Sequence, residues 1–274
     1  MTDTRTPFEE RFPRASVMGI VNVTPDSFYD GGVHLRPEPA VAAGWAMLDY
    51  GAAIVDVGGE STRPGAEPVS AEEELRRVEP VLRGLSGAPL SIDTSKAEVA
   101  RRALELGAEL VNDVTALRAD PALVEVVAEA GCYLCLMHMR GEPRTMQADP
   151  VYEDVASEVT AFLEGRLAFA VSQGIREELV CLDPGIGFGK TPEHNFELIR
   201  RLDVLLALGR PVLVGFSRKS SLGRLLGQAD ARTGPLSASI AAAVVAYERG
   251  ATMLRVHDVH ETVDALRVAQ AVAG

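Results

Sequence analysis

The sequence predicts a single-domain α/β protein with the TIM (β/α)8 barrel fold, and three observations support this prediction. The chain has 274 residues, which suits one barrel of roughly 250 residues. Eight short apolar runs recur along it, separated by longer segments with helical spacing. Polar residues gather directly after these runs, where the loops of a parallel barrel converge.

The eight runs are short and rich in β-branched residues, as is typical of strands buried on both faces. They span residues 17–21, 53–57, 90–92, 109–111, 133–137, 179–182, 212–214 and 253–256. Eight strand–helix alternations favour a closed parallel barrel over an open doubly wound sheet, which usually has fewer strands.

Helical spacing predicts helices at residues 71–85, 96–106, 121–130, 155–173 and 236–249. Glycines such as Gly107 and Gly250 precede the next strand, as helix C-terminal stops do. No linker or low-complexity tract divides the chain. We therefore expect one barrel domain at residues 17–274, preceded by a loosely packed lead-in at residues 1–16.

Composition narrows the function classes. The chain is 47% hydrophobic with a net charge of −12, which favours a large core and argues against nucleic-acid binding, though a local basic pocket could still bind a small anion. Three cysteines and no signal peptide indicate a reducing cytoplasm. No stretch approaches the roughly 18 apolar residues that predict a membrane span.

Nearly every predicted strand ends in a carboxylate, an amide or a cation. Any one of them could cap a helix, but capping does not explain all eight ends, with Lys219, Arg255 and His257 among them. These ends lie at residues 22–28, 56–65, 93–95, 112–115, 138–141, 183–189, 215–220 and 255–258.

Seven of these segments, in order, resemble the signature segments of dihydropteroate synthases. They are MGIVNVTPDSF, DVGGESTRPGA, SIDTSK, VNDVTA, DPGIGFGK, GFSRKS and LRVHDV. The resemblance runs from about Val17 to the end of the chain, where ETVDALRVAQAV is similar to the family's last helix. It implies that a pterin diphosphate is joined to p-aminobenzoate, that Mg²⁺ is required, and that the protein is a homodimer.

The resemblance also implies a pterin site. A buried carboxylate can accept both hydrogens of the pterin's amidine-like edge, and a guanidinium can stack on the ring. The apolar walls would include Ile20. The implied pterin-binding residues are Asp93, Asn112, Met137, Asp183, Lys219 and Arg255, of which Asp93, Asp183, Lys219 and Arg255 would be catalytic.

Two further subsites follow from the resemblance. The diphosphate would meet Asn22, Arg63, Arg255 and His257, with Asn22 as the one protein ligand of Mg²⁺. One amide is a weak magnesium site, so the substrate's phosphates should hold most of the ion. The p-aminobenzoate would contact Phe28, Thr62, Arg63, Pro64, Phe188, Ser217 and Lys219.

Other signals in the sequence favour structural roles. The segment at residues 184–191 is not a P-loop, because Pro184 stands where that motif needs glycine. Cys132 and Cys135 have CxxC spacing but lie in a predicted strand, which favours core packing, as we also expect for Trp45. We expect structural hydrogen bonding to loops from Asp56, Glu60, Asp113 and Asp258, while His138 could be structural or functional.

Three alternatives remain besides the synthase. A pterin-dependent methyltransfer domain should not need the p-aminobenzoate residues, and a non-catalytic paralogue should lack a pocket residue; neither fits the residues present. A phosphate-binding barrel isomerase would use a Glu or Lys base and does not predict acids that read a pterin edge.

Overall fold

The central sheet is a parallel barrel, as the sequence predicts. The computed structural model describes residues 5–24, 29–30, 34–62, 65–142, 145–228 and 233–273. The strand order is β8-β7-β6-β5-β4-β1-β10-β9, and a parallel bridge between Leu182 and Val212 closes the ring. The barrel strands are β1 (Ser16–Asn22), β4 (Ile54–Gly58), β5 (Leu90–Asp93), β6 (Leu110–Asp113), β7 (Tyr133–Met137), β8 (Val180–Asp183), β9 (Leu213–Val214) and β10 (Met253–Val256).

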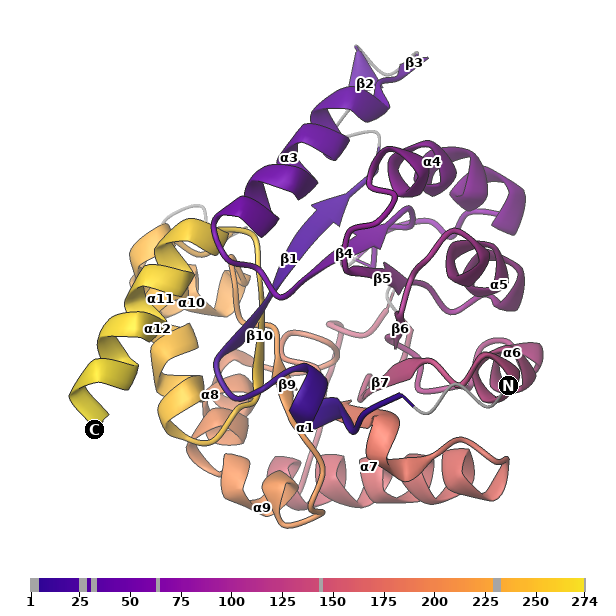
Figure 1. Cartoon of the computed structure of the whole chain (residues 1–274). Helices are drawn as coiled ribbons and strands as arrows, with labels where there is room; N and C mark the ends of the chain where they lie inside the picture. The colour runs from indigo at the N-terminus through magenta and orange to yellow at the C-terminus, as the bar shows by residue number, and fades with distance from the viewer. Residues whose placement is uncertain are drawn as a thin grey trace.

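Helices surround the strands in an outer ring (Figure 1). Caps fix where several of them begin: the Ser70 side chain accepts from Glu73 N, and Asp154 accepts from Ala156 N and Ser157 N. The helical elements are α1 (Phe8–Arg11), α3 (Pro37–Asp49), α4 (Ala71–Gly84), α5 (Ala97–Glu105), α6 (Ala122–Ala130), α7 (Val155–Ser172), η1 (Glu177–Leu179), α8 (Pro192–Arg200), α9 (Leu202–Leu206), α10 (Ser220–Leu225), α11 (Leu236–Glu248) and α12 (Val259–Ala273).

All eight predicted strands and all five predicted helices are present, with ends that shift by a residue or so. Gly107 and Gly250 have φ of 102° and 104°, as the predicted left-handed helix stops require. The sequence did not indicate the two-stranded antiparallel hairpin of β2 (Tyr29–Asp30) and β3 (His34–Leu35). It also gave no sign of the short helices α1, α9 and α10.

The expectation of a loosely packed lead-in is wrong for residues 5–16, the part of the lead-in that the structure describes. The rings of Phe8 and Phe12 are fully buried and lie 5.7 Å and 5.4 Å from the Tyr133 ring, centroid to centroid. They belong to one apolar cluster with Met18, Leu110 and other inward-facing residues at the starts of the strands. Helix α1 thus closes the N-terminal end of the barrel and lies inside the ring of helices in Figure 1.

The outward strand faces and the helices form the main core. That core is a continuous cluster of aliphatic side chains, including Val57, Leu82 and Leu134. The inward face is apolar near the N-terminal end. Closer to the C-terminal end the inward side chains of β4, β6 and β10 are Asp56, Asn112 and Arg255, joined by hydrogen bonds, and Ile20 and Met137 add apolar surface there. The barrel therefore has an apolar floor and a largely polar upper half.

Cys132, Cys135 and Cys181 are free and buried, so the prediction of core packing for the CxxC pair is confirmed. The expectation that Trp45 packs in the core is wrong. Trp45 is 40% exposed, and its Nε1 donates to Gly84 O. Within the described residues, no helix combines the length and hydropathy needed to cross a bilayer.

The buried rings of Phe8 and Phe12, here called the aromatic plug, yield a stability prediction. Replacing Phe8 with alanine should lower the free energy of unfolding by about 3–5 kcal/mol, because it removes a fully buried ring and leaves a cavity. Urea denaturation, monitored by circular dichroism, measures the change in the free energy of unfolding. Val151→Ala, at a side chain that is 61% exposed, is the control and should change stability by about 0.5 kcal/mol or less. A similarly small loss for Phe8→Ala would contradict the plug.

Candidate active site

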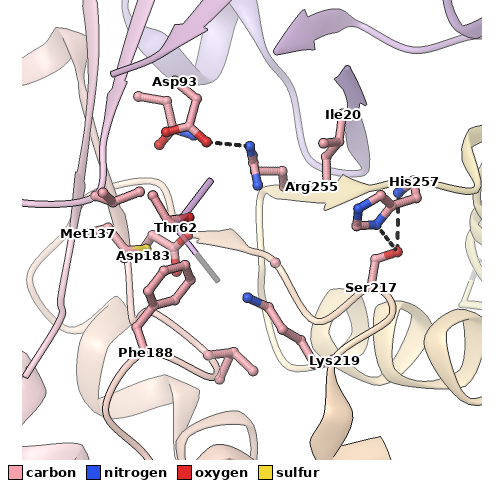
Figure 2. A pocket seen from close by; sticks show the side chains of 14 residues that line it. Ile20, Thr62, Asp93, Met137, Asp183, Phe188, Ser217, Lys219, Arg255 and His257 are labelled. Carbon is pink, nitrogen blue, oxygen red and sulfur yellow. Dashed lines mark hydrogen bonds and ion pairs between the residues drawn. The ribbon is translucent and has the colours of Figure 1, made fainter. Parts of the chain in front are cut away.

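One pocket opens at the C-terminal end of the barrel, where the predicted polar residues converge. It is lined by both polar and apolar side chains that come from most of the strand ends. Figure 2 shows side chains from separate strand ends turned toward one space, with Asp93 and Arg255 on one side and Lys219 and Phe188 on the other.

Arg255 organises the floor of this pocket. Its Nε donates to Asp56 Oδ2 and its Nη2 to Asp93 Oδ2, both at 2.7 Å. Asn112 Nδ2 donates to the same Asp56 oxygen at 2.9 Å, which leaves Asn112 Oδ1 free to act as an acceptor toward the pocket. Burial by itself lowers the pKa of Arg255, but Asp56 and Asp93 outweigh it and raise the pKa above its usual value.

Two carboxyl groups, that of the partly buried Asp93 and that of the buried Asp183, line the pocket. Burial raises the pKa of Asp93 to about 7 against the opposing effect of Arg255. Burial also raises the pKa of Asp183 to about 6, opposed by the Gly185 N–H and by Lys219. Gly185 N donates to Asp183 Oδ1 at 2.7 Å. Shifts of this kind, caused by desolvation and specific charge partners, are typical of functional carboxylates.

Lys219 and Phe188 form one side of the pocket. The Lys219 ammonium lies 4.3 Å from the centroid of the Phe188 ring, a cation–π contact. The amine points into the space between Phe188 and Arg255 in Figure 2. A flat ligand in this space would meet a cation, an aromatic face and two acids.

Ser217 and His257 form the rim beside β10. Ser217 Oγ lies 3.1 Å from His257 Nδ1 and accepts from His257 N at 3.2 Å. The hydroxyl is thereby fixed next to an imidazole, and both groups line the pocket. Together they could hold an anionic group of a ligand.

The structure brings most of the predicted site residues together. Asn22 lies at the end of β1 and is half-buried, outside the lining of this pocket. Phe28, Arg63 and Pro64 lie outside the described residues. The predicted residues that line the pocket are Ile20, Thr62, Asp93, Asn112, Met137, Asp183, Phe188, Ser217, Lys219, Arg255 and His257.

Sequence reasoning did not single out Val114 and Ile186, which add apolar lining. Both occur inside motifs that resemble the family's, VNDVTA and DPGIGFGK. Val114 lies two residues after Asn112 and Ile186 three residues after Asp183, and this closeness to predicted site residues was the signal that could have found them.

Three of the four acids expected to hold loops do so. Asp113 accepts from Thr115 N and Leu117 N and stabilises a turn in which Leu117 has a left-handed φ of 61°. Glu60 accepts from Val69 N. Asp258 binds the Arg218 guanidinium through two bonds of 2.6 Å and 2.7 Å.

The expectation that Asp56 hydrogen-bonds to a loop is wrong. It bonds to Arg255 and Asn112 inside the barrel and not to a loop. His138, whose role the sequence left open, is 6% exposed and contacts Lys190 Nζ at 2.8 Å through Nδ1. Burial lowers the pKa of His138 to about 2, so the ring is neutral.

The described residues offer few ligands for a metal ion. Among the described residues, no group of three His, Cys, Asp or Glu side chains could hold an ion. Asn22 contributes one neutral amide at a strand end, so the protein fits an ion that a phosphorylated substrate supplies with most of its ligands.

Comparisons with known proteins agree with this geometry. A model of the family described as pterin binding enzyme matches residues 18–257. A dihydropteroate synthase from Escherichia coli K12 is 48% identical over 258 residues, which cover 93% of this chain and 90% of that protein. One from Mycobacterium leprae is also 48% identical, covering 92% of this chain and 91% of that protein.

Solved structures match equally well. Xanthomonas albilineans dihydropteroate synthase with 4-aminobenzoic acid superposes with a TM-score of 0.88 at 48% identity, covering 96% of this chain and 94% of that one. The same organism's enzyme in complex with 7,8-dihydropteroate has a TM-score of 0.85 at 46% identity, covering 96% and 95%.

The raised pKa of Asp93 yields a prediction for the ligand-free protein. Its ordinary value is 3.8 and its folded value is about 7, so the folded state binds more protons between these values and stability falls as pH rises through this range. Asp93→Asn removes the charge and should stabilise the protein by about 1 kcal/mol or more at neutral pH, with little change near pH 4.

Urea unfolding at about pH 5 and about pH 8 measures the difference. The gain of Asp93→Asn over the unaltered protein should be larger at the higher pH. An Asn variant that is less stable at both values would show that the Arg255 ion pair outweighs the cost of burying this carboxylate.

Proposed function

The chain belongs to the pterin-binding enzymes, in the dihydropteroate synthase family, and we propose that the pocket at the C-terminal end of its barrel is the active site. The enzyme is a transferase of folate biosynthesis. It condenses 6-hydroxymethyl-7,8-dihydropterin diphosphate with p-aminobenzoate, giving 7,8-dihydropteroate and diphosphate.

One observation carries the assignment of the site. Asp93, Asn112, Asp183, Lys219 and Arg255 come from five different strand ends and line a single pocket. Their chemistry matches the edge of a pterin: acids and an amide for the N–H and amine groups, and cations for the carbonyl and ring nitrogens. A buried acid left without such a partner would be costly.

The reaction breaks the C–O bond between the pterin methylene and the diphosphate, and forms a C–N bond to the amine of p-aminobenzoate. The amine loses a proton as the new bond forms. Asp93 and Asp183 would stabilise positive charge that develops on the pterin, and Arg255 would lie against its ring. No covalent enzyme intermediate is needed.

The p-aminobenzoate would bind next to Phe188, Lys219, Ser217 and Thr62. The Phe188 ring offers an apolar face, and the Lys219 ammonium beside it can attract the carboxylate. Ser217 Oγ is held by His257 and can donate to the same carboxylate. The proposed contacts from Phe28, Arg63 and Pro64 lie outside the described residues.

We propose Mg²⁺ as the metal of the reaction, bound mainly by the diphosphate with Asn22 as the one protein ligand. It would neutralise charge on the departing diphosphate. His257 and Arg255 lie at the pocket and would contribute positive or hydrogen-bonding groups to the same end of the substrate.

A pterin-dependent methyltransfer domain is the second candidate. It would carry a folate that already contains p-aminobenzoate, so it has no use for a separate aromatic subsite. The Phe188–Lys219–Ser217 side of the pocket favours the synthase.

We also propose that the protein is a cytoplasmic homodimer. Exposed apolar side chains gather on α10, α11 and α12 and just after α10, which lie together in Figure 1. They are Leu225, Leu226, Val245, Val268 and Val272. A partner copy would cover them, and the sedimentation coefficient of the purified protein tests this. The three free cysteines suit a reducing compartment.

A coupling assay tests the function. The purified protein should release diphosphate from the dihydropterin diphosphate only when p-aminobenzoate and Mg²⁺ are both present. A chelator should stop the release, and added Mg²⁺ should restore it. Release that proceeds without the amine, or a pterin product without p-aminobenzoate, would contradict the synthase.

Two variants should separate the subsites. Asp183→Ala should weaken pterin binding by about 100-fold, because a buried acid that accepts two hydrogen bonds is removed. Ser217→Ala should raise the KM for p-aminobenzoate several-fold and leave pterin binding near its original value. Titration calorimetry with the pterin and steady-state kinetics with the amine measure the two effects, and the reverse pattern would exchange the assigned subsites.

A further inference from the structure

A buried lysine lies behind the pocket, where the reaction scheme above gives it no role. Lys190 follows the glycine-rich turn after β8 and is 2% exposed. Its side chain is not part of the pocket lining. Burying an ammonium group is costly unless its hydrogens are satisfied, so its surroundings should explain why it is there.

The ammonium is enclosed by acceptors from two strand ends. It donates to Gly185 O and Phe188 O, both at 3.0 Å, and lies 2.8 Å from His138 Nδ1 and 3.4 Å from His138 O. A charged lysine can only donate, so His138 Nδ1 accepts. The neutral state of His138 is consistent with this arrangement. All three ammonium hydrogens therefore have a partner.

These contacts fix the loop that carries two site residues. Gly185 O and Phe188 O belong to the turn that places Asp183 and Phe188 at the pocket, and Gly185 N bonds to Asp183 Oδ1. The turn packs tightly on the end of β7, since a Cβ at Gly185, which has a φ of 69°, would lie 1.8 Å from His138 O. The Lys190 side chain thus links this loop to the end of β7.

Lys190 also acts on Asp183 electrostatically. Burial lowers the pKa of Lys190 to about 7, and the charge of Asp183 opposes this. Reciprocally, Lys190 is one of the cations that favour ionised Asp183. The other titratable or charged groups near this pair come from β7, the β7–α7 loop, the β9–α10 loop, β10 and α8, and they are Cys135, His138, Arg140, Lys219, Arg255 and His194.

We propose that Lys190 is a positioning residue for both substrates: its ammonium holds the loop that presents Phe188 to p-aminobenzoate, and its charge favours the ionised Asp183 that binds the pterin. The inference rests on the proposed assignment of the pocket. Lys190 touches neither substrate and acts through Phe188 and Asp183.

The test compares Lys190→Met, which removes charge and donors, with Lys190→Gln, which keeps two donors without charge. Binding of the free pterin alcohol, 6-hydroxymethylpterin, is measured by fluorescence across the neutral pH range. Both variants should bind the pterin more weakly than the unaltered protein on the acid side of this range, because one of the cations that favour ionised Asp183 is gone. The binding ratio, which is the dissociation constant of the variant divided by that of the unaltered protein, should fall as pH rises. At higher pH Asp183 ionises without a nearby cation, and Lys190 itself loses its proton.

The kinetic readout addresses the loop. Lys190→Met should raise the KM for p-aminobenzoate several-fold, and Lys190→Gln should recover most of that loss, because its amide can still donate to the loop carbonyls. Arg201→Met is the control: it makes the same change in net charge at a surface ion pair with Asp154, so its binding ratio should not vary with pH.

The proposal is overturned if folded variants show a binding ratio that is constant with pH, or if Lys190→Met keeps the original KM for p-aminobenzoate. Circular dichroism establishes folding. If the Met variant does not fold, the Gln variant carries the pH test. Because pterin binding needs no turnover, this readout stands even if the unaltered protein failed the coupling assay, so the two failures are distinguishable.

Discussion

The site depends on one partly buried guanidinium. Arg255 rises from β10 and pairs with Asp56 on β4 and Asp93 on β5. A buried charge is tolerable only when its hydrogens have partners, and these two acids meet that need while Asn112 shares the Asp56 oxygen. The network fixes the orientation of Asn112 and Asp93 at the pocket. The pocket is thus arranged by residues that lie far apart in the sequence.

This network explains why the barrel has two levels. Charged groups in the upper half cannot pack a core, so the apolar contacts that hold the strands together are concentrated below them and outside the sheet. Phe8 of helix α1 and Phe12 directly after it complete that lower level. Burial in this upper level raises the pKa values of Asp93 and Asp183, because desolvation disfavours the charged carboxylates.

In the loop after β8, both backbone and side-chain contacts position the residues that line the site. Asp183, Gly185 and Phe188 lie within six residues, yet each needs a different partner: a backbone N–H, the end of β7 and the ammonium of Lys190. Close packing against His138 O leaves no room for a side chain at Gly185. The loop presents an acid and an aromatic ring to the same pocket with little freedom for either.

The sequence alone determined the barrel and most of the pocket. Short β-branched runs, helical spacing and polar strand ends are local signals, and a parallel barrel brings strand ends together whatever the loops contain. These signals placed Asp93, Asp183, Lys219 and Arg255 at strand ends, and the resemblance of their motifs to those of dihydropteroate synthases singled them out as site residues. The burial of Phe8 could not be, because four residues of helix in a polar segment give no periodic signal.

Tertiary structure alone decided the roles of Asp56 and Lys190. In the sequence Asp56 looks like any acid at a strand end, and its partner Arg255 is 199 residues away. Lys190 follows a glycine-rich segment whose sequence gives no sign of its partners, and its ammonium contacts backbone carbonyls and His138, 52 residues earlier. Local propensity does not encode which distant groups a buried charge will meet, and the free energy of burying that charge depends on those groups.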